Sequence, residues 1–380
     1  MNEYGKPLFE KELNYCIRCC MPETNEGMEF DELGICKACR SSEQKMHIDW
    51  DTRRKELENI LNSYRSETNY DCIVPISGGK DSLYQLHLIK KVFKMNPIAV
   101  TFSHNHYTET GRYNLKIGLE KLDIDHIEYT PKRSLVDRLM KESLCHIGDA
   151  CWHCHAGVGA FPLHMAVKLN IPLVIYGESP AEHSGRTTYA DCPARYGADH
   201  FTKHSAKVTA EKIIQNSTIE KKDMMFMTPP SEEDIKKLDL EFMYLGDYIF
   251  WDAEYFTDFI IKHYGWKEEY VEGTYKKYKS VECKMPGVHD YTKFLKRGFG
   301  RGTDFASQDV RAGIITREEG FELAKEYDFD EPEILEYYLE RTGYSREEFF
   351  DIMIKQRSGN GTKLPDKDFF MGKKRSKKFE

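Results

Sequence analysis

The sequence predicts an α/β fold, in which a doubly wound parallel sheet is joined to an N-terminal zinc-ribbon segment and a C-terminal helical region. Three observations predict it: short apolar runs alternate with segments of helical periodicity, a glycine loop follows the first run, and paired cysteines precede it. Because single cores stop growing at about 250–300 residues, a chain of 380 residues is expected to form several domains. We expect the ribbon at residues 1–45, the sheet at 46–226 and the mainly helical region at 227–380.

Four cysteines near the N-terminus form two C-x-x-C pairs, Cys16 with Cys19 and Cys36 with Cys39. The tight turn of each pair directs two thiolates at one ion, and four sulfur ligands suit a tetrahedral zinc ion. Cys20 leaves a C-x-x-x-C reading of the first pair open, although the spacing favours Cys19. A segment this short cannot bury a core of its own, so the metal is expected to supply its folding energy.

The sheet is predicted from four apolar runs, and a helix over residues 50–61 is expected to link the ribbon to them. The runs lie at residues 72–76, 97–102, 124–129 and 172–177, with helical periodicity between them. In such sheets, ligands bind beyond the carboxyl ends of the strands. We therefore expect the loop that begins at Ser77, the stretch 103–106 and the turn Gly177–Glu178 to share one crevice.

The loop after the first apolar run reads Ser77-Gly78-Gly79-Lys80-Asp81-Ser82. Two glycines allow a sharp turn that gathers backbone N–H groups into a nest, with the positive end of the following helix behind them. Such a nest binds phosphate, whereas a bare glycine turn, the alternative, would not require the flanking polar residues. The loop is shorter than a Walker P-loop, which has four residues between its two glycines.

This string resembles the PP-loop of the ATP pyrophosphatase superfamily, whose enzymes split ATP between its α and β phosphates and transfer AMP to a substrate oxygen. The resemblance implies that the loop holds the departing pyrophosphate, with Lys80 neutralising charge and Asp81 binding Mg²⁺ or capping the helix. Lys80 and Asp81 are thus the expected catalytic residues. The expected nucleotide-binding residues are Ser77, Gly78, Gly79, Lys80, Asp81, Ser82, Gly177 and Glu178.

A third C-x-x-C pair, Cys151 with Cys154, lies between the third and fourth predicted strands. Other metal-ligating residues surround it: Cys145, His146, His153 and His155. A related branch of PP-loop enzymes that thiolates RNA holds an iron–sulfur cluster with cysteines in a comparable place, while the histidines leave zinc open. The third ligand would be Cys145, Cys192 or Cys283, and ordinary core or active-site thiols are the alternative.

A basic, glycine-containing stretch runs from residue 289 to residue 311. It contains Lys293, Lys296, Arg297, Arg301 and Arg311 with Gly298, Gly300 and Gly302. Small residues let an anion approach the backbone while Arg and Lys neutralise it, so Arg297 and Arg301 are candidate ligands for a substrate phosphate. By composition alone, a solvated helix with a glycine hinge is an equal alternative.

The last third of the chain is rich in Tyr, Phe, Glu and Lys and is predicted to be helical. Thr316 with Glu319, and Ser345 with Glu348, fit the capping box, in which a hydroxyl and a carboxylate each satisfy a free backbone N–H. Helices are therefore expected to begin at these positions. Gly343 is expected to separate the two helices of a hairpin.

Four features together resemble the N-acetyl sugar amidotransferase family: the cysteine ribbon, the SGGKDS loop, the segment Cys151-Trp152-His153-Cys154-His155 and the string HDYTKFLKRGFGRGTDFASQDVRAGIITREEG. The resemblance runs over nearly the whole chain, and the last string is its specific part. It implies a role in surface-polysaccharide or flagellin-glycan pathways, where the acetamido group of a nucleotide-activated N-acetyl sugar becomes an acetamidino group. The implied cofactors are ATP, Mg²⁺ and Zn²⁺.

The nitrogen source follows from what the sequence does not offer. No cysteine stands with His and Glu partners in a recognisable glutaminase pattern, so ammonia is expected from a partner. The resemblance points to glutaminase and synthase subunits similar to those of imidazole glycerol phosphate synthase. The alternative function is a tRNA-modifying enzyme that uses the same adenylation to deliver sulfur, with the Cys151 cluster as its metal or iron–sulfur site.

Charge and hydropathy limit the class of partner. The formal net charge is -8 with both signs evenly scattered, which argues against a broad nucleic-acid surface. No stretch approaches the ~20 apolar residues of a membrane span, and the charged residues near the N-terminus leave no apolar signal core. The protein is expected to be cytoplasmic, a compartment in which cysteines stay reduced and their spacing indicates metal binding.

Overall fold

The computed structural model describes residues 4–182, 186–194, 196–197, 199–215 and 217–371. Within these residues, five strands form one parallel sheet in the order β3-β2-β1-β4-β5. The strands are β1 (Cys72–Pro75), β2 (Pro97–Phe102), β3 (His126–Tyr129), β4 (Leu173–Tyr176) and β5 (Glu241–Tyr244). Because β1 lies at the centre and the order reverses beside it, the predicted doubly wound α/β fold is confirmed.

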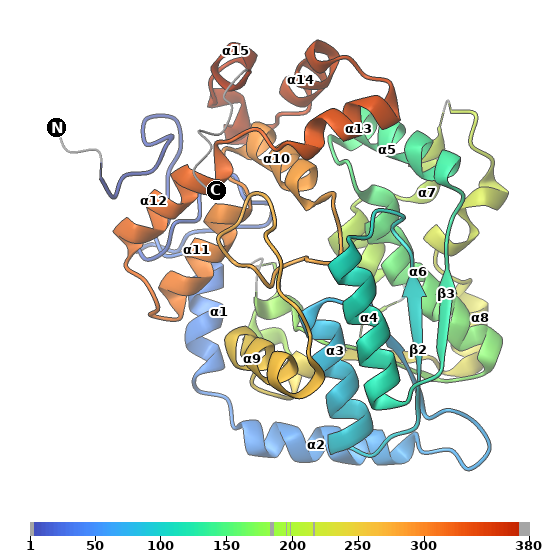
Figure 1. Ribbon diagram of the computed structural model, residues 1–380. Helices are drawn as coiled ribbons and strands as arrows, with labels where there is room; N and C mark the ends of the chain where they lie inside the picture. The colour runs from blue at the N-terminus through green and yellow to red at the C-terminus, as the bar shows by residue number, and fades with distance from the viewer. Residues whose placement is uncertain (1–3, 183–185, 195, 198, 216, 372–380) are drawn as a thin grey trace.

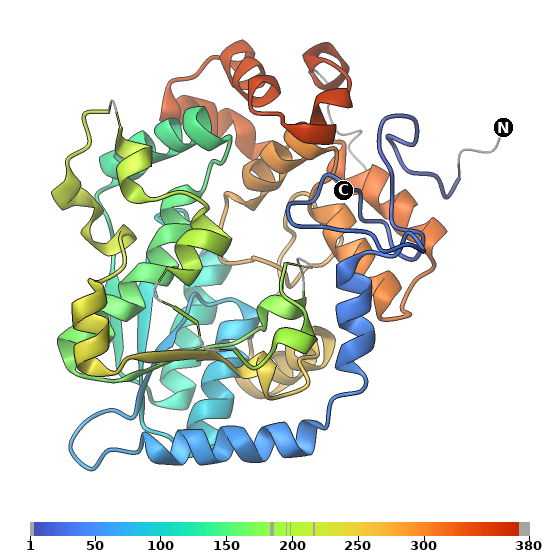
Figure 2. The same cartoon turned by 180° about the vertical axis from the view of Figure 1, so that it is seen from behind.

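Helices cover both faces of the sheet because successive strand residues point to opposite faces. Cys72 and Val74 of β1 pack into an apolar cluster with α3 (Lys80–His87), α4 (Glu109–Leu122) and α9 (Ala253–Tyr264). Ile73, between them, packs into the opposite cluster, with α5 (Arg133–Ile147) and α6 (Trp152–Leu169). Figures 1 and 2 show these two layers from opposite sides. Two short helices, α7 (Ala210–Ile214) and α8 (Glu232–Leu238), lie between β4 and β5 in the sequence.

Strand β5 was not predicted, and it lies beyond residue 226, where the sequence placed the end of the sheet domain. It pairs in register with β4, from Leu173 opposite Glu241 to Tyr176 opposite Tyr244. The sheet unit therefore extends to α9. A four-residue apolar run cannot be told from a helical segment by its periodicity, which explains why the surrounding helical pattern concealed this strand.

The helical region follows α9 and confirms the predicted helix starts. Its helices are α10 (Pro286–Arg297), α11 (Arg301–Arg311), α12 (Arg317–Asp328), α13 (Ile334–Thr342), α14 (Arg346–Lys355) and α15 (Lys367–Phe370). Complete capping boxes begin α12 at Thr316 and α14 at Ser345, and Gly343, with a φ of +72°, ends α13. Buried Tyr338 and Phe349 join a cluster that includes residues of α5, so this region packs on the sheet unit.

In both views, the N-terminal segment lies beside α11 and α12, although these helices are far from it in the sequence (Figures 1 and 2). The Arg317 side chain donates hydrogen bonds to the carbonyl oxygens of Cys16 and Cys19, at 2.8 to 3.2 Å. Helix α1 (Lys37–Lys45) leads to α2 (Trp50–Ser63), the predicted linking helix, whose first turn is capped by Asp49. Among the described residues, no helix combines the length and apolar character that a membrane crossing requires.

Candidate active site and metal centre

The loop between β1 and α3 requires both of its glycines. Gly78 has a φ of +92°, and a Cβ atom there would lie 2.7 Å from the carbonyl oxygen of Gly111. Gly79 is the N-cap of α3. Inside the loop, the Gly79 N–H donates to Ser77 Oγ at 3.2 Å, and the Ser77 N–H donates to Ser82 Oγ at 3.3 Å. The two serines hold the loop at the N-terminal end of α3, where an anion is favoured.

Lys80 and Asp81 form a charge pair at the start of α3. Lys80 is 2% exposed, and its Nζ lies 2.5 Å from Asp81 Oδ1, which also accepts a 3.2 Å hydrogen bond from Trp251 Nε1. Burial acts to lower the pKa of Lys80, but the Asp81 and Glu178 carboxylates outweigh it and raise the pKa above its ordinary value. Lys80 is thus a buried cation. No side chain caps α3, so the capping role is not seen for Asp81, and its role at Mg²⁺ stays a prediction.

A cavity of about 720 Å³ opens over the carboxyl ends of β1, β2 and β4, and we call it the PP-loop cavity. The structure brings together in its wall the three loops that the sequence placed in one crevice: the Ser77 loop, His104 after β2, and Gly177 with Glu178 after β4. Gly78 lies beneath, where its carbonyl accepts a 2.9 Å hydrogen bond from Trp266 Nε1. One side of the wall is apolar, with Val100, Phe102, Val158, Pro162, Tyr176 and Phe201. A purine ring needs a surface of this kind.

Three cysteines line the PP-loop cavity: Cys151, Cys154 and Cys283. Cys283 reaches it because its backbone forms an antiparallel bridge with Tyr107. Of the other two candidates for a third ligand, Cys145 is exposed, and Cys192 lies 3.9 Å from Ser179 Oγ, outside this wall. Burial raises the pKa of all three cavity thiols. Their sulfur atoms do not converge as ligands of a single ion among the described residues, so a second metal site stays a prediction.

The basic glycine stretch divides into two parts. Arg301 lines the cavity, with its Nε 2.6 Å from Asp290 Oδ2, whereas Arg297 forms an ion pair with Glu26 of the N-terminal segment and is absent from the described lining. The glycines do let an anion approach the backbone, but that anion is Asp328. Its carboxylate accepts from the Gly300 and Gly302 N–H groups at 2.8 and 2.6 Å. The phosphate-binding roles of both arginines stay predictions.

Two residues of the site carried no recognisable sequence signal. Lys279 and Glu282 both line the PP-loop cavity. Glu282 lies over the loop, because a Cβ atom on Gly79 would be 3.1 Å from Glu282 Oε2. That oxygen is buried and has no hydrogen-bond partner among the described residues, and burial raises the pKa of the carboxyl group. In a single sequence, a Lys or Glu residue that belongs to no motif looks the same whether it lies in a site or on the surface.

The metal centre is formed by the four predicted ribbon cysteines. Their sulfur atoms all lie within 4.8 Å of one another, with 3.9 Å between Cys16 and Cys39 and 3.7 Å between Cys19 and Cys36. The structure also settles the reading of the first pair. Cys20 is outside the group, and its Sγ lies 3.6 Å from the carbonyl oxygen of Arg317.

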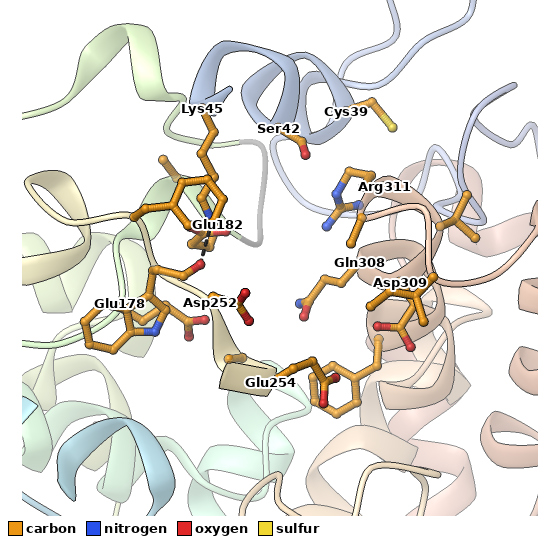
Figure 3. A pocket seen from close by; sticks show the side chains of 18 of the residues that line it. Cys39, Ser42, Lys45, Glu178, Glu182, Asp252, Glu254, Gln308, Asp309 and Arg311 are labelled. Atoms are coloured by element: carbon orange, nitrogen blue, oxygen red, sulfur yellow. Dashed lines mark hydrogen bonds and ion pairs between the residues drawn. The ribbon is translucent and has the colours of Figure 1, made fainter. Parts of the chain in front are cut away.

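A second cavity, of about 760 Å³, separates the ribbon from the sheet unit, and we call it the ribbon-side cavity. Figure 3 shows Gln308, Asp309 and Arg311 of α11 across it from Glu178, with Cys39 at one end. The two cavities adjoin, since both are lined by Glu178, Tyr278, Lys279, Phe305 and Gln308. The ribbon therefore forms part of the wall next to the phosphate loop.

Comparison with protein families identifies the helical region. Residues 272–366 match the family model described as LPS biosynthesis protein WbpG-like, C-terminal domain. Because of this similarity, we call residues 272–366 the WbpG-like domain. The match confirms the resemblance to the N-acetyl sugar amidotransferase family in the segment that holds its most specific string. The WbpG-like domain also supplies Lys279, Glu282, His289 and Arg301 to the PP-loop cavity, so two domains build the candidate site.

Two further proteins are similar to this chain. The uncharacterized protein MJ1599 of Methanocaldococcus jannaschii is 33% identical over 93 residues, which are 24% of this chain and 33% of that protein. The chain thus matches about a third of the length of this curated relative. The solved U34-tRNA thiolase NcsA from Methanococcus maripaludis with its [4Fe-4S] cluster aligns over 81% of this chain and 88% of that chain, with 13% identity and a TM-score of 0.31. A likeness this weak carries no argument about chemistry.

The metal centre yields the first prediction. Replacing Cys16 or Cys36 with Ser is expected to remove one equivalent of bound metal per chain and to make the ribbon sensitive to protease, because metal binding supplies its folding energy. Cys20→Ser is the matched control, since Cys20 is equally buried but lies outside the four-sulfur group. Elemental analysis of the purified variants measures the metal. Unchanged metal in Cys16→Ser would show that this group is not the ligand set.

Proposed function

We propose that this protein is an ATP-dependent amidotransferase that converts the acetamido group of a nucleotide-activated N-acetyl sugar into an acetamidino group. The observation that carries the proposal is the shared cavity. The PP-loop residues line the same space as residues of the WbpG-like domain, among them Lys279, Glu282, His289 and Arg301. A lipopolysaccharide-biosynthesis domain and a pyrophosphate-binding loop at one site support activation of a sugar substrate by ATP.

In the first step, the acetamido oxygen attacks the α-phosphorus of ATP. The bond between the α-phosphorus and its bridging oxygen breaks, and pyrophosphate leaves into the nest formed by Ser77, Gly79 and the start of α3. The buried ammonium group of Lys80 offsets the charge that develops on the phosphate oxygens. Asp81, beside Lys80, would hold a Mg²⁺ ion that accompanies ATP. The product of this step is an O-adenylyl imidate.

In the second step, ammonia adds to the imidate carbon, the bond from that carbon to the AMP oxygen breaks, and one proton is released. AMP leaves and the amidine remains. Ammonia is mostly protonated at pH 7, and an activated imidate is open to water, so a partner that delivers neutral ammonia gains both concentration and protection. We propose that this partner comprises glutaminase and synthase subunits resembling those of imidazole glycerol phosphate synthase.

We further propose that the ribbon holds zinc. In a tetrahedral site with Zn–S bonds of about 2.3 Å, neighbouring sulfur atoms are about 3.8 Å apart. The sulfur separations of 3.9 and 3.7 Å in the ribbon fit one such ion. The Arg311 guanidinium, 3.9 Å from Cys19 Sγ, offsets part of the negative charge that four thiolates carry.

A second candidate function is tRNA thiolation. The observation that favours it is the presence of Cys151, Cys154 and Cys283 in the PP-loop cavity, where they would hold an iron–sulfur cluster beside the adenylated substrate. The net charge of -8 argues against it, because tRNA binding depends on neutralising phosphates with basic residues. The sugar reaction is therefore preferred.

The roles of Lys80 and Asp81 can be tested by pyrophosphate release. The assay contains ATP, Mg²⁺, ammonium and a panel of nucleotide-activated N-acetyl sugars, and mass spectrometry identifies the amidine. Lys80→Ala and Asp81→Ala are expected to lower the rate by about 100-fold or more. The protein should stay folded, because these side chains interact with charged groups of the substrate and do not fill an apolar core. Lys91→Ala, on an exposed lysine soon after α3, is the control. Wild-type rates in both site variants would refute the assignment.

The nitrogen source gives a separate prediction. High concentrations of ammonium should support amidine formation by the purified chain alone, whereas glutamine should not. Adding the glutaminase partner should restore the use of glutamine, because it supplies neutral ammonia directly. If the isolated chain hydrolyses glutamine at a rate that matches amidine formation, the proposed division of labour is wrong.

The second metal site is tested with anaerobically purified protein. If the three cavity cysteines hold an iron–sulfur cluster, the protein should be brown, and Cys151→Ser, Cys154→Ser or Cys283→Ser should bleach it. Cys145→Ser is the control, since Cys145 belongs to the same sequence cluster but is exposed. A colourless, iron-free wild-type protein would exclude the cluster and, with it, the thiolation mechanism.

A further inference from the structure

The segment 278–284 of the WbpG-like domain is held over the phosphate loop by its backbone. The Thr108 N–H donates to the carbonyl oxygen of Glu282 at 3.2 Å, and the Lys284 N–H donates to the carbonyl oxygen of His106 at 2.9 Å. Gly111 permits this approach, because a Cβ atom there would lie 2.4 Å from Glu282 Cα. The position of the segment is therefore fixed by main-chain contacts with the loop after β2 and the first turn of α4.

This segment brings a second buried lysine to the first. Lys279 is 8% exposed, and the positive charge of Lys80 lies close enough to lower its pKa. Lys279 also lines both cavities, as does Glu178, so it stands where the PP-loop cavity meets the ribbon-side cavity. In Figure 3, Glu178 marks this junction.

Aromatic rings hold the two ammonium groups in place. The Tyr278 ring centroid lies 5.7 Å from Lys80 Nζ and 5.9 Å from Lys279 Nζ, and the Phe305 centroid lies 4.9 Å from Lys279 Nζ. The Tyr278 hydroxyl donates to Glu254 of α9, which fixes the ring. The face of an aromatic ring attracts a cation but does not neutralise it.

Two neighbouring ammonium groups out of water repel each other, and this cost falls when an anion lies between them. The nearby carboxylates are Asp81 and Glu178, and Asp81 Oδ1 also accepts a hydrogen bond from Trp251. A ligand with two or more negative charges can form ion pairs with both lysines at once. Pyrophosphate has this chemistry and, under the proposed function, is formed at this loop.

We propose that Lys279 is a second pyrophosphate-binding catalytic residue, which acts from the WbpG-like domain opposite Lys80 when the bond between the α and β phosphates breaks. This inference rests on the proposed function and deepens it. It makes the WbpG-like domain a part of the ATP site, in addition to any contact with the sugar. Lys80 and the backbone nest bind the leaving group from one side, and Lys279 binds it from the other.

The binding test uses full-length, metal-loaded protein and sodium pyrophosphate with Mg²⁺ in a calorimeter. Lys279→Ala is expected to weaken pyrophosphate binding by about 10- to 100-fold, the range for loss of one charge-assisted hydrogen bond. Lys279→Arg keeps the charge and should recover most of the affinity. Lys277→Ala is the matched control, because Lys277 immediately precedes the segment and is exposed. Circular dichroism and metal content establish that each variant is folded.

The pH dependence provides a readout that a purely structural lysine would not change. Burial, and then the charge of Lys80, lower the pKa of Lys279 to about 8 in the free protein. The groups that face it are Lys80 and Asp81 of α3, Glu178 after β4 and Glu254 of α9. Since only the protonated amine attracts pyrophosphate, wild-type affinity should fall as the pH rises through 8. Lys279→Arg should lack this fall, because Arg stays charged, and pyrophosphate's own titration is common to both proteins.

The outcomes separate this inference from the proposed function. Failure of the wild-type protein to bind either ATP or pyrophosphate would overturn both. If the wild-type protein binds pyrophosphate and Lys279→Ala binds it within twofold of the wild-type value, the PP-loop assignment stands and the role of Lys279 is wrong. A fall in affinity above pH 8 that persists unchanged in Lys279→Arg would also overturn that role.

Discussion

The candidate site depends on one set of backbone contacts, those that hold residues 281–284 against residues 106–108. Without them, the phosphate loop would face an open crevice at the carboxyl edge of the sheet, as in any doubly wound fold. With them, the WbpG-like domain closes one side of that crevice and places Lys279, Glu282 and Cys283 next to the loop. The contacts are between main-chain atoms, apart from the Thr108 hydroxyl bond to Val281. Their geometry therefore depends on Gly111 more than on any charged residue.

The enclosure has an electrostatic consequence. Lys80, Lys279, Glu282 and Arg301 would be ordinary surface charges on separate domains, but here they share one cavity. Burial moves the pKa of Lys279 down and that of Glu282 up, while the carboxylates beside Lys80 keep that lysine charged. Such opposed shifts in one cavity are typical of sites that bind charged ligands or transfer protons. The same low-dielectric setting strengthens each interaction with a phosphate group.

The sequence predicted the parts of this molecule whose signal is local. The glycine loop at Ser77, the two C-x-x-C pairs of the ribbon and the capping boxes at Thr316 and Ser345 are each defined by spacing within a few residues, and the structure contains them where predicted. It did not predict β5, whose four residues have no strand period. Nor did it predict Lys279, which becomes a site residue only through pairing of segments 170 residues apart in the sequence. The glycines of the basic stretch show a third kind of difference: Gly300 and Gly302 do admit an anion to the backbone, but that anion is Asp328 of the protein itself, and a phosphate at this stretch stays a prediction.

The ribbon forms part of the surroundings of the same site. Cys39 lines the ribbon-side cavity, and that cavity is joined to the phosphate loop at Glu178 and Lys279. Arg317 of α12 donates hydrogen bonds to the carbonyl oxygens of Cys16 and Cys19, and Arg311 of α11 contacts Cys19 Sγ. These contacts hold the first cysteine pair of the ribbon against α11 and α12. Helix α11 carries Phe305 as well, which faces Lys279 at 4.9 Å. A metal ion held by the four cysteines would therefore order a segment that packs on α11, the helix whose Phe305 faces Lys279.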